Sequence, residues 1–574
     1  MQRYAARLSL RKPSHRAGLL VIVCVLAALA VAAGSEESVM STDVLGQDLI
    51  GHWPLDRDCR DVSAHGHHGE NRGVTFRDGA AWFDGRDSQI IVPDSPSLRI
   101  GTQDFSVAAW IRTDEALDDV LGDILGKFDP ARRAGINFCI QNFHGVTSGQ
   151  PNYRNVFFGI DDGGELTVWR DCGRPGNAVM IWALCVYDGA LYAATFEAGK
   201  EEAGHVYRYD GGDTWTDCGS PYPSNAVTSL AVFDGRLYAA ASHYRSAGSA
   251  LPESENTIPG GRVFRYEGGA AWTDCGRVAE IEGIGGLAVY RGRLYASSLV
   301  APAGLFCYEG GTRWAECGHP GGRVEALAVH NGGLYGSGWD PAFAGVYRYD
   351  ADGTWTDCGI PEGTTQTYSF AIHGGRMYVG VWPGGKVFRY GGGTAWEDCG
   401  RLGEELEVMG MAVYNGKLYA GTLPLASVFR YDGDGRWTDT GRLDRTPDVK
   451  YRRVWSMAVF DGKLFCGVLP SGHVHAFEAG RCVSVDRELP SGWAHVAATR
   501  SGASLNLFIN GQLAAASEAS GLDALDLSNT QPLTIGFGAH DYFNGALRDV
   551  RLYGRALDAE EVVCLASQPK ERTE

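Results

Sequence analysis

Aromatic residues beside polar ones are the side chains of this sequence whose chemistry is easiest to interpret. They lie at the ends of short apolar segments, where loops are expected. An aromatic plane with a hydrogen-bonding rim suits a sugar ring or a peptide segment. Packing between neighbouring sheets is the alternative role for each of them. The candidate ligand-binding residues are Trp182, Phe196, His243, Trp339, Asp340, Tyr368, Trp382 and Trp455.

Three aspartates near the start of the chain are candidate metal ligands. Asp56, Asp58 and Asp61 offer hard oxygen atoms that could hold a structural calcium ion, although calcium takes six or more oxygen ligands. The neighbouring HGHHG stretch at 65–69 is better explained as a turn than as a metal site. No paired carboxylates at a shared strand position, nucleophile motif or metal-ligand spacing is apparent. The sequence therefore predicts no catalytic residue and no certain cofactor.

Repeats position these side chains. A segment such as AVFDGRLYA, at 231–239, occurs in seven copies, and each is followed by a segment such as RVFRYEGG at 262–269. A third segment, exemplified by WTDCG at 272–276, also occurs seven times. Each unit is interpreted as four short strands joined by glycine turns, which is one blade of a β-propeller. The sequence thus predicts a seven-bladed propeller over 169–480.

The order of these segments indicates how the propeller closes. The third segment begins with Trp and is called the Trp strand. Its first copy, WRDCG at 169–173, precedes every copy of the other two segments, and the last repeat has no Trp strand of its own. We therefore expect 169–173 to complete the last blade. The cysteines of the Trp strands are interpreted as small buried side chains, because equivalent positions one blade apart are too distant for a disulfide. A bridge between Cys185 and Cys466 is a further hypothesis.

The amino terminus has the composition of a secretory signal peptide. Residues 1–33 carry five basic residues, no acidic residue and an apolar core of about 16 residues, which is short for a membrane span. Cleavage would change the formal net charge from −18 to −23 and make nucleic acid an improbable partner class. We expect a secreted, extracellular or periplasmic protein, with a membrane contact only if the segment stays uncleaved.

Two flanking segments show strand alternation but are each too short for a domain. They contain FDG before a PDS turn, DFSVAAWI at 104–111, WAHVAA followed by LFINGQL, and GALRDVRLYGRAL at 545–557. This set resembles the laminin-G-like, concanavalin-type jelly roll, a two-sheet sandwich whose members commonly bind glycans, proteins or structural calcium. The resemblance predicts one sandwich built from 45–168 and 481–566, followed by a tail at 567–574, with the propeller inserted.

The repeats also resemble known propeller families. The glycine turn before a Tyr is similar to kelch and galactose-oxidase-like repeats, and DGGDTW at 210–215 is similar to a sialidase-type Asp-box, which forms a turn. The tyrosine, carboxylate and arginine set of a sialidase and the copper ligands of a galactose oxidase cannot be assembled. We therefore expect an all-β protein that recognises a glycan or an extracellular protein without catalysis. A glycoside hydrolase and an adhesive scaffold are the alternatives.

Overall fold

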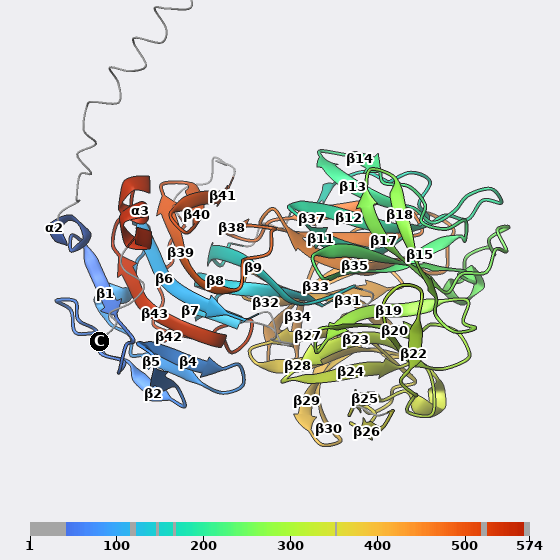
Figure 1. The fold of residues 1–574 in the computed structure, drawn as a ribbon, viewed down its shortest axis with the longest axis horizontal. Helices are drawn as coiled ribbons and strands as arrows, with labels where there is room; N and C mark the ends of the chain where they lie inside the picture. The colour runs from blue at the N-terminus through green and yellow to red at the C-terminus, as the bar shows by residue number, and fades with distance from the viewer. Residues whose placement is uncertain are drawn as a thin grey trace, which may run out of the picture. The chain divides into compact units, whose positions relative to one another are not determined.

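The computed structural model describes residues 42–114, 122–144, 148–164, 168–350, 353–517 and 525–567. The predicted signal segment and nearly all of the tail lie outside these residues. The described helices are α2 (Thr42–Leu45), α3 (Ala559–Ser567) and the short 3₁₀ turns η1 (Pro96–Leu98), η2 (Ser246–Ser249) and η3 (Pro341–Phe343). None of them has the length and apolar character that crossing a membrane requires. The remaining elements are strands, as predicted (Figure 1).

Residues from both flanks pair in one eight-stranded sheet. In this sheet β6 (Phe105–Thr113) from the first flank lies between β39 (Gly492–Ser501) and β43 (Asn544–Tyr553) from the second. Both flanks therefore supply strands to one sheet, and Figure 1 shows their blue and red strands side by side. The other strands are β1 (Leu49–Trp53), β3 (Thr75–Arg77), β4 (Ala80–Asp84), β40 (Ser504–Ile509) and β41 (Gln512–Ala516).

A second group of strands forms the other layer of the sandwich. Its strands pair in the order β2, β5, β42, β7, β8, β9 and β38. Phe105 from the first sheet and Phe138 and Phe158 from the second belong to one buried core. The bounds are β2 (Glu70–Arg72), β5 (Gln89–Val92), β7 (Gly122–Asp129), β8 (Ala134–His144), β9 (Ser148–Asp162), β38 (Arg481–Ser484) and β42 (Leu533–Ile535).

Five separate four-stranded sheets form blades of a propeller. Each is antiparallel, and its strands follow the chain order that the repeats predict, with one exception described below. The first four are β19 (Ile284–Tyr290), β20 (Arg293–Ser298), β21 (Leu305–Tyr308), β22 (Trp314–Glu316); β23 (Val324–His330), β24 (Gly333–Gly338), β25 (Val346–Tyr349), β26 (Trp355–Asp357); β27 (Gln366–His373), β28 (Arg376–Trp382), β29 (Lys386–Gly392), β30 (Ala395–Arg401); and β31 (Glu407–Tyr414), β32 (Lys417–Leu423), β33 (Ser427–Gly433), β34 (Arg436–Arg442).

The predicted number of seven separate blades is not confirmed. The strands of the first two repeats pair in the same order, but they belong to a 15-stranded sheet that also contains the second sandwich layer. The joining pairs are few: Phe196 with Ala226, and Leu230 and Ala231 with backbone of β9. These strands are β11 (Met180–Tyr187), β12 (Ala190–Phe196), β13 (Val206–Gly211), β14 (Thr214–Asp217), β15 (Ala226–Phe233), β16 (Arg236–Ser242), β17 (Arg262–Gly268) and β18 (Ala271–Arg277).

The fifth blade contains strands from both ends of the repeat array, as predicted. It consists of β35 (Arg453–Phe460), β36 (Lys463–Leu469), β37 (Val474–Phe477) and β10 (Arg170–Asp171), which pairs with β37. The first strands of successive repeats contact one another in chain order, and β35 contacts β11. The array therefore closes on itself.

Tryptophan side chains link neighbouring repeats. The Nε1–H of Trp215 donates to the Cys172 carbonyl oxygen at 2.8 Å, and Trp272, Trp314, Trp396 and Trp437 donate to the equivalent carbonyls. At the closing position Trp169 donates to the Thr440 oxygen at 3.1 Å. Thr440 occupies the position at which the other repeats have the cysteine. Each of these bonds gives a donor to a backbone carbonyl group of the neighbouring repeat.

The repeated cysteines behave as predicted. Five of the six are buried, Cys317 is half-buried, and all are free thiols. The hypothesis of a Cys185–Cys466 bridge is wrong, because both are free and pack in different apolar clusters. The turns between first and second strands need positive φ, as Asp234 (φ 50°) and Gly235 (φ 64°) show, which explains the repeated Asp-Gly and Asn-Gly pairs.

The chain leaves and re-enters the sandwich on adjacent strands. β9 ends at Asp162, shortly before β10, and β38 begins at Arg481, shortly after β37. These two sandwich strands pair antiparallel, with Phe158 opposite Val483. The propeller is therefore inserted between neighbouring strands of a single sheet.

Candidate functional site

A bulge re-aims one side chain in the first strand of every repeat. In each of the seven first strands the register against the second strand shifts at the same place. Bulges of this kind redirect side chains and are common beside functional sites. One equivalent residue of each repeat lies at the bulge, three positions before the start of the segment exemplified by AVFDGRLYA. These residues are Trp182, Thr228, Gly285, Glu325, Tyr368, Met409 and Trp455.

A pocket of about 480 Å³ lies at this end of the first strands. Three of the bulge residues line it, together with Gln366, Glu407 and Arg453, the first residues of their strands, and Arg323, which directly precedes β23. Loops that follow second strands contribute the remaining walls, among them the segment around η2. The volume is within the range of pockets that hold small organic ligands. Aromatic lining residues are Trp182, Tyr244, Trp339, Tyr368, Trp382, Tyr451 and Trp455.

The structure brings six of the eight predicted ligand-binding residues together around this pocket. These are Trp182, His243, Trp339, Tyr368, Trp382 and Trp455. Phe196 is fully buried and packs edge-on against Tyr244, with ring centroids 5.3 Å apart. Asp340 instead accepts hydrogen bonds from the backbone N–H and the Nε of Arg323, each at 2.9 Å. Phe196 and Asp340 therefore support the pocket from outside its lining.

The aromatic walls differ in exposure. Trp182, Tyr368 and Trp455 are buried among apolar neighbours, while Trp339 and Trp382 are half-buried and pack against the same cluster. Trp182 contacts Tyr244 edge-on at 4.4 Å and Trp455 at 5.2 Å between ring centroids. The alternative role that the sequence left open, packing between repeats, is thus the role of the deep residues. The two half-buried tryptophans present surface to the pocket.

Charged groups at the pocket floor are paired. Arg453 lies 3.4 Å from a Glu407 carboxylate oxygen, and both side chains are buried. Burial raises the pKa of Glu407, although Arg453 opposes this shift. Burial also tends to raise the pKa of Asp340, but the hydrogen bonds from Arg323 outweigh it and lower that pKa. Two cations of the lining are thus compensated by their own carboxylate partners.

Glu325 is different, because its carboxylate is completely buried and neither oxygen has a hydrogen-bond partner among the described residues. Burial, and then the Glu407 carboxylate, raise the pKa of Glu325 well above its ordinary value. The Nε1–H of Trp455 also lacks a partner among those residues. A buried polar group without a partner is costly, so these two groups need an explanation.

The two buried carboxylates are not among the residues predicted from the sequence. They do not share a repeat position, because Glu325 is equivalent to Trp182 and Glu407 is equivalent to Arg323, two positions earlier. Comparing every residue at the bulge position across the seven copies would have found Glu325. The signal was a charged residue at a position otherwise held by apolar, small or aromatic ones.

The predicted calcium ligands serve other partners. The Asp61 carboxylate accepts hydrogen bonds from the backbone N–H groups of His52 at 2.9 Å, Ser63 at 2.8 Å and His67 at 2.6 Å. Asp58 accepts from the N–H of Arg60 at 2.9 Å, and Asp56 lies 4.0 Å from the guanidinium of Arg57. Asp61 therefore organises the turn, as the sequence suggested for HGHHG. Calcium binding here stays a prediction.

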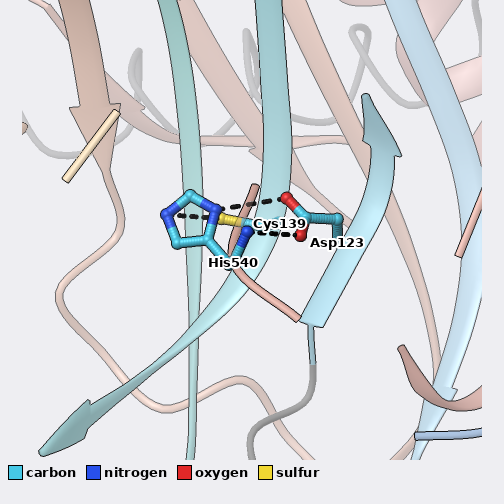
Figure 2. A group of neighbouring side chains, drawn as sticks. All are labelled: Asp123, Cys139 and His540. Carbon is cyan, nitrogen blue, oxygen red and sulfur yellow. Dashed lines mark hydrogen bonds and ion pairs between the residues drawn. The ribbon is translucent and has the colours of Figure 1, made fainter. Parts of the chain in front are cut away.

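A second cluster joins three buried side chains between β7, β8 and the loop before β43 (Figure 2). Asp123 and Cys139 are directly opposite each other on β7 and β8. His540 donates its backbone N–H to Asp123 Oδ2 at 2.9 Å, and its Nδ1 lies 3.2 Å from Asp123 Oδ1. Its Nε2 lies 3.9 Å from the Cys139 sulfur. Nothing in the sequence spacing indicated this cluster, since 401 positions separate Cys139 from His540.

The fold and the pocket define a class: an all-β chain in which a jelly-roll sandwich and a pocketed propeller form parts of one chain. Residues 459–563 match the family described as the Concanavalin A-like lectin/glucanases superfamily, Laminin_G_3. The match begins within β35, before the predicted boundary at 481. No curated protein matches the chain.

Solved structures similar to part of the chain have low sequence identity. A streptogramin B lyase structure has 10% identity and a TM-score of 0.43, and the match covers 57% of this chain and 99% of that chain. YCF48 bound to D1 peptide has 12% identity and a TM-score of 0.40, covering 55% and 96%. The WD40 propeller domain of Doa1 has 11% identity and a TM-score of 0.37, covering 55% and 98%.

Proposed function

We propose that the protein is a non-enzymatic recognition protein that binds a glycan in the pocket at the first strands. The observation that carries this proposal is the lining itself, in which seven aromatic side chains surround polar groups. Sugar rings present apolar C–H faces and hydroxyl groups, so they match aromatic planes beside buried donors and acceptors. An extracellular protein segment is the alternative ligand, and the pocket volume favours a small ring over a broad protein surface.

An unpartnered polar group in the lining supports a hydroxyl-rich ligand. Glu325 is completely buried and is not one of the lining residues, whereas Trp455 lines the pocket and its Nε1–H has no partner among the described residues. The Trp455 Nε1–H is a donor only. A hydroxyl group of a sugar, or a water that it holds in place, can accept from this N–H, whereas an apolar ligand leaves it unpaired.

A paired tryptophan variant tests the binding site. Trp339→Ala together with Trp382→Ala should reduce binding in a glycan array at least tenfold, because stacking on two aromatic planes is lost. The melting temperature should change little, since both side chains are half-buried. Trp493→Ala on the sandwich strand β39 is the control and should bind normally. Unchanged binding by the double variant would refute this location.

The chain is further proposed to be secreted, extracellular or periplasmic, and its propeller to have seven blades. The composition of residues 1–33 supports export. Seven first strands in a closed ring, and four antiparallel strands in each of the first two repeats, support the larger blade count. A size shift of the exported protein on immunoblotting tests the cleavage of the signal segment.

One observation favours a hydrolase as the second candidate. Glu325 and Glu407 are both buried and both have a raised pKa, which is how carboxylates are tuned for acid and base roles in glycoside hydrolysis. Turnover of a chromogenic glycoside panel, lost in Glu407→Gln, would establish this candidate. Saturable binding without turnover would leave recognition as the function.

A further inference from the structure

The cluster of Asp123, Cys139 and His540 lies apart from the pocket and has no role in the proposed recognition. One ligand atom from each residue lies within 4.8 Å of the others, and all three side chains are buried. The donor set is a thiol, an imidazole and a carboxylate (Figure 2). These are the ligand types that zinc-class divalent ions use in proteins.

The loop that carries His540 is shaped around Asp123. The N–H groups of His540 and Asp541 both donate to Asp123 Oδ2, at 2.9 and 3.0 Å. Gly538 passes so close to the carboxylate that a Cβ atom there would lie 2.6 Å from its carbon. The carboxylate and the imidazole are thus held in a fixed relation before any ligand arrives, which is the preorganisation that an ion site needs.

The distance between the His540 and Asp123 ligand atoms suits tetrahedral coordination. His540 Nδ1 and Asp123 Oδ1 are 3.2 Å apart. Two ligand atoms about 2.0 Å from a tetrahedral zinc ion are about 3.3 Å apart. The Nε2 atom then carries the proton, and it lies 3.4 Å from the side-chain amide of Gln141 and 3.9 Å from the Cys139 sulfur. Turning that amide presents its oxygen as the acceptor.

The thiol gives the cluster its selectivity. Cys139 is completely buried beside Asp123 and His540, and its sulfur is the soft ligand of the set. A soft divalent ion displaces the thiol proton and compensates the buried carboxylate, whereas calcium and magnesium prefer oxygen ligands alone.

We propose that Asp123, Cys139 and His540 bind one zinc-class divalent ion, which fastens the loop before β43 to the sandwich sheet. This loop also contacts the propeller. The N–H of Gly374, in the turn between β27 and β28, donates to the Ala539 oxygen at 2.9 Å, and that of Gly375 approaches the His540 oxygen at 3.4 Å. The ion therefore stabilises a contact between the two parts of the chain.

Metal analysis of the full chain tests the proposal. Protein expressed with added zinc and then dialysed should retain about one zinc per chain by elemental analysis. Cys139→Ser should retain at least tenfold less. Cys466→Ser, which alters an equally buried thiol in β36, is the matched control and should retain the wild-type content. Negligible zinc in the wild-type protein, or equal zinc in Cys139→Ser, would overturn the proposal.

Cobalt keeps the test decisive if Cys139→Ser fails to fold. Wild-type protein produced with cobalt should show the near-ultraviolet charge-transfer absorption of a thiolate bound to Co²⁺, and removal of the metal should lower the melting temperature. Bound cobalt without the thiolate absorption, or no bound cobalt, counts against the site. Both readouts are independent of glycan binding, so their failure leaves the proposed function untouched.

Discussion

Replacing Trp169 by Phe removes one donor from the contact that joins the two ends of the repeat array. The Trp169 indole donates to the Thr440 oxygen at 3.1 Å, and its ring lies 4.5 Å from that of Phe477. Phe keeps most of the ring contact and loses the hydrogen bond. A hydrogen bond of this kind contributes about 1 kcal/mol net, and leaving the carbonyl unpaired adds to the loss, so we expect destabilisation of about 1–2 kcal/mol.

The sequence contains a matched control for this change. Trp355 occupies the same repeat position in β26, but its Nε1–H has no partner among the described residues. Trp355→Phe should therefore change the free energy of unfolding by less than about 0.5 kcal/mol. Denaturant unfolding of both variants, followed by tryptophan-independent circular dichroism, gives the comparison. Equal losses at the two positions would refute the argument that the indole donor, rather than ring size, secures closure.

The remaining predictions concern Asn415 at the interface between the sandwich and the propeller, the buried Glu325, and the half-buried tryptophans of the pocket. Asn415→Ala should lower the free energy of unfolding by about 2–4 kcal/mol, because its buried amide donates to the Ile160 and Ala479 oxygens. The equivalent Asn331 also has a positive φ but is exposed, so Asn331→Ala should cost far less in thermal unfolding. The pKa of Glu325 is raised in the folded state, so above the ordinary value of 4.5 the unfolded state loses a proton that the folded state keeps. The stability of the wild-type protein therefore falls as pH rises. Glu325→Gln should be the more stable form at about pH 8 but not at about pH 4. A stability difference between Glu325→Gln and wild type that does not change with pH would contradict this assignment. Titration calorimetry of the Trp339 and Trp382 double variant should show no heat with a glycan that the wild-type protein binds.

The repeat pattern predicted the strands because every copy has the same local chemistry. Alternating apolar residues and Asp-Gly or Asn-Gly turns determine each hairpin, and the displaced Trp169 indicated the closing strand. The sequence could not predict that the strands of the first two repeats join the second sandwich layer in one sheet. This joining depends on a few backbone pairs, such as Phe196 with Ala226 and Leu230 with β9. Such pairs reflect how closely neighbouring strands approach, which residue types do not encode.

The candidate site was predictable in its aromatic part only. Trp182, Tyr368 and Trp455 recur at one repeat position, so their convergence follows from the repeat itself. Glu325 shares that position, but its chemical state depends on complete burial, which only the packed ring provides. The Asp123 and His540 cluster depends on a loop far away in the chain, and no local pattern specifies that meeting.

The pairing of β9 with β38 has a consequence for how such a chain can arise. The propeller connects these two strands as a turn connects the strands of a hairpin, since β9 and β38 are neighbours in one sheet. A single genetic event can therefore add or remove the whole propeller without changing the order of the sandwich strands. Hydrogen bonds at the junction hold the propeller against the sandwich. The Asn137 amide donates to the Asn415 side-chain oxygen at 3.0 Å, and the Lys417 amine donates to the Pro130 carbonyl oxygen.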